Sequence, residues 1–177
     1  LSPVTENSNT GVRLSTAVAA NYGDIGSNAV DLSYSNSAST TRGATGTWST
    51  AMGSITEASG YSSTAMGRDT EASGDYSTAM GASTTASGSV STAMGNGSTA
   101  SGQSSTAMGG YTTASGYTST AMGRQTSASG VYSTAMGRNT TASGQSSTAM
   151  GESTTASDFG STVIGQYNSS GSTVTNS

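Results

Sequence analysis

From residue 47 onward the chain repeats one short pattern of small, apolar and polar residues. The first copy reads TWSTAMGSITEASG, and eight copies of 14 residues fill positions 47–158 without an insertion. A ninth, degraded copy, FGSTVIGQYNSSG, follows at 159–171. Self-similarity at one fixed period is typical of proteins that stack identical units. The pattern therefore predicts a solenoid and argues against a disordered Ser/Thr/Gly linker.

Each copy consists of two similar halves. In the consensus xxSTAMGxxTxASG, the run STAMG is matched seven residues later by TxASG. Each half ends on Gly, which supplies the positive φ that a tight corner needs, and two variable residues follow it. We therefore expect one short strand and one turn from each half, so that a coil has two strands and the solenoid two sheets. Coils would stack about 4.8 Å apart.

The alternation of side chains along each strand predicts which residues line the interior. In the first strand of the fifth copy, Ser105 and Ala107 share one face and Thr106 and Met108 share the other. A coil this short has a thin interior, so the small pair should point inward. In its second strand, the pattern likewise places Thr112 and Ala114 inside. Thr113 and Ser115 then lie outside. Buried hydroxyls would need partners, which we expect among backbone groups of the turns or neighbouring coils.

The sixth place of the repeat forms one continuous apolar row. It comprises Met52, Met66, Met80, Met94, Met108, Met122, Met136 and Met150, with Ile164 in the ninth copy. An exposed apolar stripe of this length is normally covered, so we expect a seam between chains, for which unbranched Met is well suited. The alternative is that Met points inward and fills the coil. The unbroken alanine columns, from Ala51 to Ala149 and from Ala58 to Ala156, argue against it.

The first, second, eighth, ninth and eleventh places vary from copy to copy. They hold Trp48, Tyr61, Tyr76, Tyr111, Tyr117, Tyr132, Arg68, Arg124, Arg138, Asp69 and Glu152. Tyrosine and arginine at such corners are candidates for contact with a receptor or a glycan. The alternative is that they keep the corners soluble or pack against neighbouring protomers.

Composition narrows the range of functions. Only 8% of the 177 residues are charged and 31% are hydrophobic, against about 25% and about 45–50% in ordinary globular domains, so no large apolar core can form. The chain has no Cys and no His, and its five cationic residues are scattered, so no nucleic-acid partner is expected. No apolar run approaches the roughly 18 residues of a membrane span.

The few carboxylates do not indicate catalysis or metal binding. Glu57 and Glu71 stack one coil apart on an exposed face and are expected to be solvated acids rather than a catalytic pair. Asp69, Glu71 and Asp75 could bind calcium only weakly, and the Gly-Gly-x-Gly-x-Asp calcium repeat is absent from the sequence. We therefore expect that the protein is not an enzyme and that it has no metal site and no cofactor.

The outside of the second sheet suggests an alternative function. Thr113, Ser115 and their equivalents form a polar ladder that loosely resembles the threonine ladders of antifreeze solenoids. Glu57 and Glu71 interrupt this ladder, and its second column is Ser, which lacks the methyl group of Thr. Ice binding is therefore the second hypothesis, after a structural or adhesive role.

The coil xxSTAMGxxTxASG closely resembles the head repeat of YadA-like trimeric autotransporter adhesins, the Hep/Hag repeat, which reads roughly NSVAIGxxSxAxG at the same spacing. The resemblance covers 47–171 and includes both Gly corners, the Ala between two outward residues and the Ser/Thr that opens each strand. It implies a left-handed parallel β-roll, three chains to a trimer, with one sheet facing the threefold axis. Thr50 and Met52, and their equivalents, take the places of paired aliphatic residues in the family, and Thr is a departure from its Val.

The regions flanking the repeats resemble the shoulders of β-roll fibre proteins. We expect an N-terminal cap over 1–46, in which 29–34 forms an irregular strand that caps the first coil, then the repeats, and then a degraded coil and tail over 159–177. In some such fibres a C-terminal intramolecular chaperone is cut away, and here it would lie beyond Ser177.

The sequence thus predicts an all-β parallel β-solenoid or β-roll, and the family resemblance implies that it is left-handed and assembles as a homotrimer. Its expected function is that of a structural fibre or adhesin segment, a rigid rod on a cell or virion surface. The expected partners are a surface glycan or a protein receptor.

Overall fold

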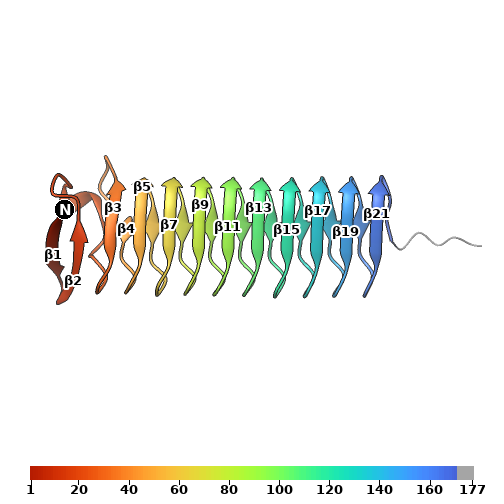
Figure 1. Cartoon of the computed structure of the whole chain (residues 1–177), viewed down its shortest axis with the longest axis horizontal. Helices are drawn as coiled ribbons and strands as arrows, with labels where there is room; N and C mark the ends of the chain where they lie inside the picture. The colour runs from red at the N-terminus through yellow and green to blue at the C-terminus, as the bar shows by residue number, and fades with distance from the viewer. Residues whose placement is uncertain (171–177) are drawn as a thin grey trace, which may run out of the picture.

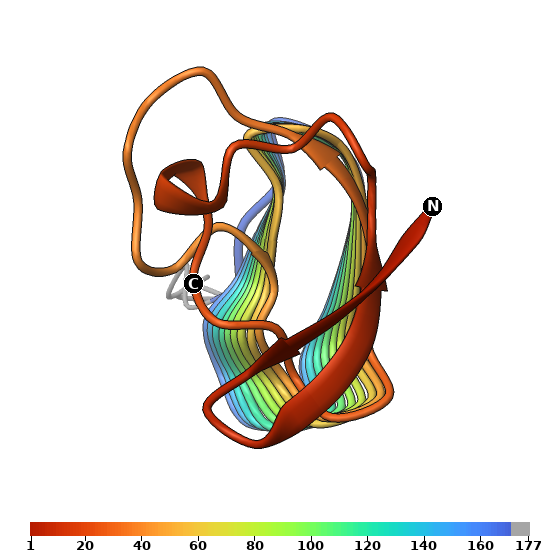
Figure 2. The same ribbon diagram turned by 90° about the vertical axis from the view of Figure 1, so that its left-hand side faces the viewer.

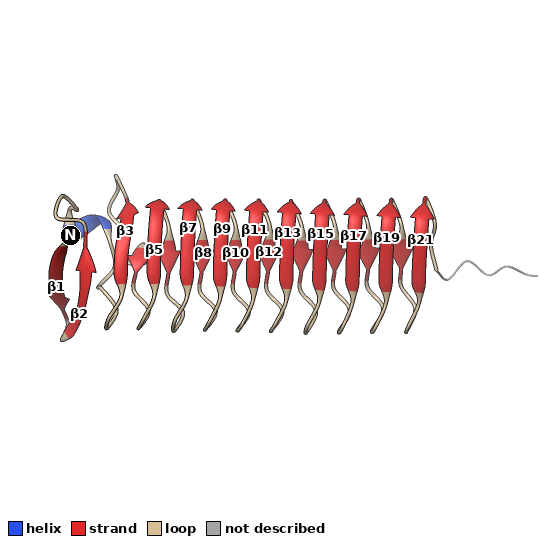
Figure 3. Cartoon of the chain, viewed as in Figure 1, coloured by secondary structure: helices blue, strands red, loops and turns tan. Residues whose placement is uncertain are grey.

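The computed structural model describes residues 1–170, in which each repeat contributes one long and one short strand (Figures 1 and 3). The residues T-A-M-G-x, or T-V-I-G-x in the last copy, form the long strands β5 (Thr50–Ser54), β7 (Thr64–Arg68), β9 (Thr78–Ala82), β11 (Thr92–Asn96), β13 (Thr106–Gly110), β15 (Thr120–Arg124), β17 (Thr134–Arg138), β19 (Thr148–Glu152) and β21 (Thr162–Gln166). The short strands are β4 (Gly43–Ala44), β6 (Glu57–Ala58), β8 (Glu71–Ala72), β10 (Thr85–Ala86), β12 (Thr99–Ala100), β14 (Thr113–Ala114), β16 (Ser127–Ala128), β18 (Thr141–Ala142) and β20 (Thr155–Ala156). Four elements precede them, namely β1 (Ser2–Glu6), β2 (Asn9–Arg13), the 3₁₀ helix η1 (Ala19–Asn21) and β3 (Val30–Tyr34).

The strands form two sheets that run the length of the molecule. The long strands, with β1, β2 and β3, make a 12-stranded sheet, and the short strands make a 9-stranded sheet. Pairing is parallel except between β1 and β2, and each residue of the repeats pairs with the residue 14 positions later, as Met108 does with Met122. This register confirms the predicted β-solenoid with 14-residue coils.

The solenoid is left-handed. With the N-terminus on the left, the long strands run upward on the near side (Figure 1). Seen from the N-terminal end, this sheet lies on the right, and the chain crosses the top to the other sheet (Figure 2). The path therefore turns anticlockwise as it recedes from the viewer, which is the hand that the family resemblance implied.

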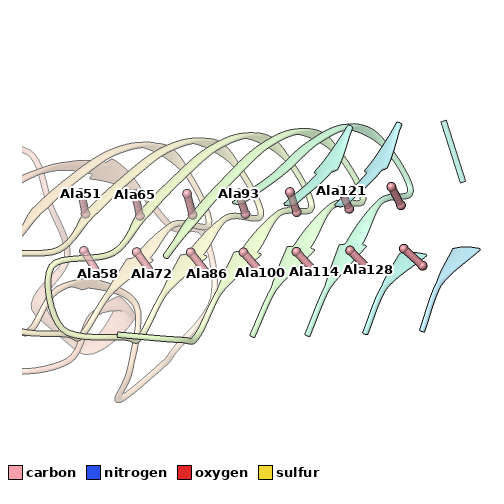
Figure 4. Packing of buried hydrophobic residues seen from close by; sticks show 14 of the residues in the cluster. Ala51, Ala58, Ala65, Ala72, Ala86, Ala93, Ala100, Ala114, Ala121 and Ala128 are labelled. Atoms are coloured by element: carbon pink, nitrogen blue, oxygen red, sulfur yellow. The ribbon is translucent and has the colours of Figure 1, made fainter. Parts of the chain in front are cut away.

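Two facing columns of alanine make the core. One column comes from the long strands and one from the short strands, and their methyl groups point toward each other across the interior (Figure 4). Every alanine from Ala51 to Ala149 and from Ala58 to Ala156 is fully buried, as are the Ser and Thr that share their faces. The prediction that small residues line the interior is confirmed, and the thin interior explains why no large apolar core is needed.

The prediction of partners for the buried hydroxyls was wrong for most of the coils that the structure describes. Ser49 donates to the carbonyl oxygen of Gly46 at 2.7 Å, and Thr112 donates to Ser98 at 2.9 Å. Thirteen other inward hydroxyls have no hydrogen-bond partner. The nearby backbone carbonyl oxygens accept hydrogen bonds between coils, as the Ser119 oxygen does from the Thr106 N–H at 2.9 Å.

The predicted positive φ is present at the first glycine of each repeat and absent at the second. Gly109 has φ +126 but lies within β13, and the second glycine, Gly102, does not have a positive φ. Positive φ instead falls on the second variable residue of each corner, for example Ser104 and Tyr111, both at +56°. Gly102 is required for another reason, because a Cβ there would lie 2.0 Å from the carbonyl oxygen of Gly116 in the next coil.

The N-terminal end of the solenoid is covered by strands rather than by an irregular segment. Residues 29–34 were expected to cap the first coil irregularly, but β3 pairs with β5 along all five of its residues. The strand β2 then pairs with β3, and β1 folds back on β2 in an antiparallel hairpin. Between β3 and β5, the loop 35–42 projects from the coil beside η1 (Figure 2).

A buried ionic cluster closes the interior at this end. Asp31 occupies the inward place that Ala51 has in the next coil and is fully buried. The Arg13 guanidinium donates through Nε to Asp31 Oδ2 at 3.1 Å, through Nη1 to Glu6 Oε1 at 3.0 Å and through Nη2 to the Gly23 oxygen at 2.9 Å. A buried charge pair is tolerated when its hydrogen bonds are satisfied in this way. The cluster therefore ends the alanine core and fixes the position of the terminal hairpin.

Replacing Asp31 by alanine should loosen only this end of the molecule. Arg13 would remain buried without its carboxylate, which costs several kcal/mol, so amide exchange in β2 and β3 should become about a hundredfold faster. Coils beyond β11 should exchange at the wild-type rate because each coil contacts only its neighbours. Hydrogen exchange with mass spectrometry measures both, and Asp158→Ala, at an exposed carboxylate near the other end of the solenoid, is the control. Uniformly faster exchange along the whole chain would contradict a local capping role.

Candidate interaction surfaces

The outer face of the long-strand sheet carries the predicted apolar row. Within β13, Ala107 is buried, whereas Thr106 and Met108 are partly exposed on the opposite side. The most exposed methionines are Met52, at 39%, and Met122, at 36%. Each methionine pairs in register with the next along the sheet. The outward orientation of Met is therefore confirmed, and the alternative of Met filling the coil is wrong.

The row extends further than the sequence indicated. Leu32 of β3 pairs with Met52, so the row begins one coil before the first repeat. The fixed 14-residue period missed it because Leu32 and Met52 are separated by 20 positions, owing to the loop 35–42. The alternation of apolar and polar residue types over Val30–Tyr34, VDLSY, is the sequence signal that could have found it. We call the set from Leu32 through the eight methionines to Ile164 the methionine row.

The outer face of the short-strand sheet is polar. Glu57 pairs with Glu71 in the register that the sequence predicted, and each carboxylate accepts a hydrogen bond from the serine two residues later, Ser59 or Ser73. Threonine or serine occupies the same place from Thr85 onward. A groove of about 370 Å³ lies where the loop 35–42 meets this face. The two outer faces of the coil therefore differ in polarity.

The carboxylates of the described residues do not gather into a cluster that could hold a metal ion. Within residues 1–170, no group of three or more His, Cys, Asp or Glu side chains could hold a metal ion. Asp69 accepts a hydrogen bond from Ser83 at 3.2 Å, and Asp75 accepts one from the Tyr61 N–H at 2.9 Å. Asp69 and Asp75 were considered, together with Glu71, as weak calcium ligands. In the structure these two carboxylates instead accept hydrogen bonds from neighbouring coils.

The variable corner residues divide between two opposite edges of the solenoid. The first and second places of the repeat precede each long strand, at the lower edge in Figure 1, and the eighth and ninth places end it, at the upper edge. The lower edge holds Trp48, Tyr61, Tyr76, Tyr117 and Tyr132, together with Val90, Val131 and Phe159. The upper edge holds Arg68, Arg124, Arg138, Asp69, Glu152 and Tyr111. We call them the aromatic edge and the polar edge.

The repeats of the chain match a known family of proteins. Residues 44–70, 58–84, 72–89, 86–112, 114–140 and 142–168 match the family model described as the YadA head domain repeat (2 copies). The matched segments cover more than half of the chain. The chain belongs to the YadA head domain repeat family. No curated protein matches it.

Membership of the YadA head domain family identifies the chain as a segment of an adhesin-type trimeric autotransporter. The family is one of adhesins and not of enzymes. In the part of the chain that the structure describes, no helix has the length and apolar character to cross a membrane. The structural or adhesive class, predicted from the repeat, is therefore supported at this level.

On the aromatic edge of this YadA-type head, two tyrosine pairs recur. The rings of Tyr61 and Tyr76 lie 5.4 Å apart at an interplanar angle of 71°, and those of Tyr117 and Tyr132 lie 5.6 Å apart at 82°. Both are edge-to-face contacts, the favourable geometry for aromatic pairs. The sequence did not reveal these pairs, because each joins the first place of one copy to the second place of the next.

On the polar edge, charged side chains stack from coil to coil. Arg124 pairs in register with Arg138, and Arg138 with Glu152, to which its guanidinium is also bonded. Ion pairs this exposed contribute about 0–1 kcal/mol to stability. Tyr111 is the exception among these charges, with 63% of its surface exposed. This edge is therefore solvated and charged, in contrast to the aromatic one.

Proposed function

We propose that three copies of this chain assemble about an axis facing their long-strand sheets and form a rigid rod on an extracellular surface. The observation that carries the proposal is the methionine row, an unbroken line of partly exposed apolar side chains from Leu32 to Ile164. A line of this kind on a free surface is normally covered by protein. The opposite face is polar and needs no cover.

The hydrogen bonding between successive coils supports a rigid rod. Each long strand from β3 to β19 is hydrogen-bonded to a strand on both sides, so the backbone is held along its length. About 11 turns at about 4.8 Å each give a rod of about 50 Å. Apart from the loop 35–42, side chains at the corners are the variable part of the surface, and they project from both edges. We propose that these corners contact the host, another surface or a glycan.

The mass of the purified chain under native conditions tests the assembly. Three chains of 17.2 kDa are expected in one particle. Native mass spectrometry and sedimentation at micromolar concentration measure this independently. A stable monomer that leaves the methionine row in water would overturn the proposal.

A further inference from the structure

The two tyrosine pairs of the aromatic edge occupy equivalent positions in the solenoid. Tyr117 follows Tyr61, and Tyr132 follows Tyr76, by four repeats of 14 residues. At about 4.8 Å per coil, the two pairs lie about 19 Å apart along one line. Both pairs present their rings to solvent, with 43% and 58% of the surface exposed in the first and 44% and 54% in the second.

The tyrosines at the second place are held in a backbone conformation that aromatic residues seldom adopt. Tyr76 and Tyr132 both have φ +58, a region in which Gly, Asn and Asp are favoured. Local stability therefore does not account for tyrosine at these places. Hydrogen bonds to the preceding coil also hold this backbone in place. The Tyr76 N–H donates to the backbone oxygen of Tyr61 at 2.7 Å, and the Tyr132 N–H donates to that of Tyr117 at 2.8 Å. The same positive φ recurs at the second place of the other copies, for example at Ser62 and Ser104, so the coil itself holds these exposed rings in a fixed position.

The chemistry around the rings points to an uncharged ligand. Only two carboxylates, Asp75 and Asp158, lie at the corners of this edge between 47 and 160, and Asp75 Oδ1 accepts the Tyr61 N–H. The other neighbours on this edge are uncharged: Val90 and Val131 are apolar, whereas Ser62, Gln103 and Thr118 offer hydroxyl and amide groups. No arginine stands on this edge to attract a phosphate or a sulfate. Aromatic faces bind the apolar C–H faces of sugar rings, and the hydroxyl and amide groups bind their hydroxyls.

The shape of the edge favours an extended chain over a folded protein. A standard protein interface needs about 800 Å² on each partner. The tyrosine pairs instead form two small platforms on a narrow ridge, separated by two coils whose corner residues are Ser89, Val90, Gln103 and Ser104. A linear polymer can contact both platforms at once. Binding at the first platform raises the effective concentration of the polymer at the second, so the overall affinity increases.

We propose that the aromatic edge binds an extended, uncharged polysaccharide, which contacts Tyr61 and Tyr76 at one platform and Tyr117 and Tyr132 at the other. The inference deepens the proposed function and rests on it, because the edge must remain outside the trimer. Weak contacts repeated along three chains would give strong attachment to a surface that carries such a polymer.

Affinity electrophoresis in gels that contain dextran, galactomannan or soluble β-glucan tests the proposal, with heparin as the anionic comparison. Wild-type protein should be retarded by at least one neutral polymer and not by heparin. Tyr61→Ala with Tyr76→Ala should weaken the binding about tenfold, as should Tyr117→Ala with Tyr132→Ala, and all four together should abolish it. Tyr111→Ala, on the polar edge, is the matched control and should bind as wild type.

The native mass of every variant is measured in the same samples. An intact trimer that none of the neutral polymers retards, or a fourfold variant that is retarded like wild type, would overturn the inference and leave the proposed function standing. Loss of the trimer in the fourfold variant alone would overturn it too, because the rings would then pack against a second copy. A monomeric wild-type chain would overturn the proposed function itself.

Discussion

Replacing Gly109 by alanine is expected to destabilise the solenoid by about 2–5 kcal/mol, through backbone strain and through overpacking. Gly109 has φ +126, which side-chain-bearing residues rarely adopt. A Cβ added there would lie 1.9 Å from the carbonyl oxygen of Gly123 in the next coil. Because the clash is with backbone, no side chain can move away to relieve it. Thermal and denaturant unfolding, followed by circular dichroism, measure the loss.

The neighbouring residue supplies a matched control. Gly110 has no positive φ, and the nearest atom to its added Cβ would be the Arg124 Cγ at 3.9 Å. Gly110→Ala should therefore change the stability by no more than about 0.5 kcal/mol. Equal destabilisation by the two substitutions would show that the close stacking of coils at Gly109 is not what limits the repeat.

Placing glutamate in the methionine row should dissociate the proposed trimer. Met108 lies at the middle of the row, partly exposed on the long-strand sheet. If this face meets the threefold axis, Met108→Glu brings three carboxylates together in an apolar seam, and like charges so placed cost several kcal/mol. We expect assembly to weaken about a hundredfold or more. Native mass and sedimentation measure the shift from trimer to monomer.

Two control variants distinguish loss of the seam between chains from a general effect of a charge or of replacing Met108. Thr113→Glu introduces the same charge on the short-strand face, where Glu57 and Glu71 already stand at equivalent places, and should leave the native mass unchanged. Met108→Leu keeps the row apolar and should also leave the mass unchanged. A Met108→Glu protein that assembles like wild type would mean that the row faces solvent.

The sequence by itself determined the coil and its two faces. A side-chain period of two and a repeat of 14 residues leave one register in which Ala107 and Ala114 point inward, and the structure has that register. The same alternation placed Met108 outside. These predictions succeeded because they depend on local geometry that is copied in every coil.

Features that depend on contacts between coils were decided by the tertiary structure alone. Gly102 is needed because of the Gly116 carbonyl in the next coil, and positive φ falls two residues later, on Ser104. Leu32 joins the methionine row only because the loop 35–42 restores the register of β3 with β5.

The same holds for the N-terminal cluster and the two edges. Arg13 and Asp31 are separated by 18 positions with no repeat to relate them, so their pairing arises only when β2 lies beside β3. The tyrosine pairs join different places of successive copies, which a column-by-column comparison does not align. The period of the sequence thus determined what each coil is, whereas the stacking of one coil on the next decided which side chains meet.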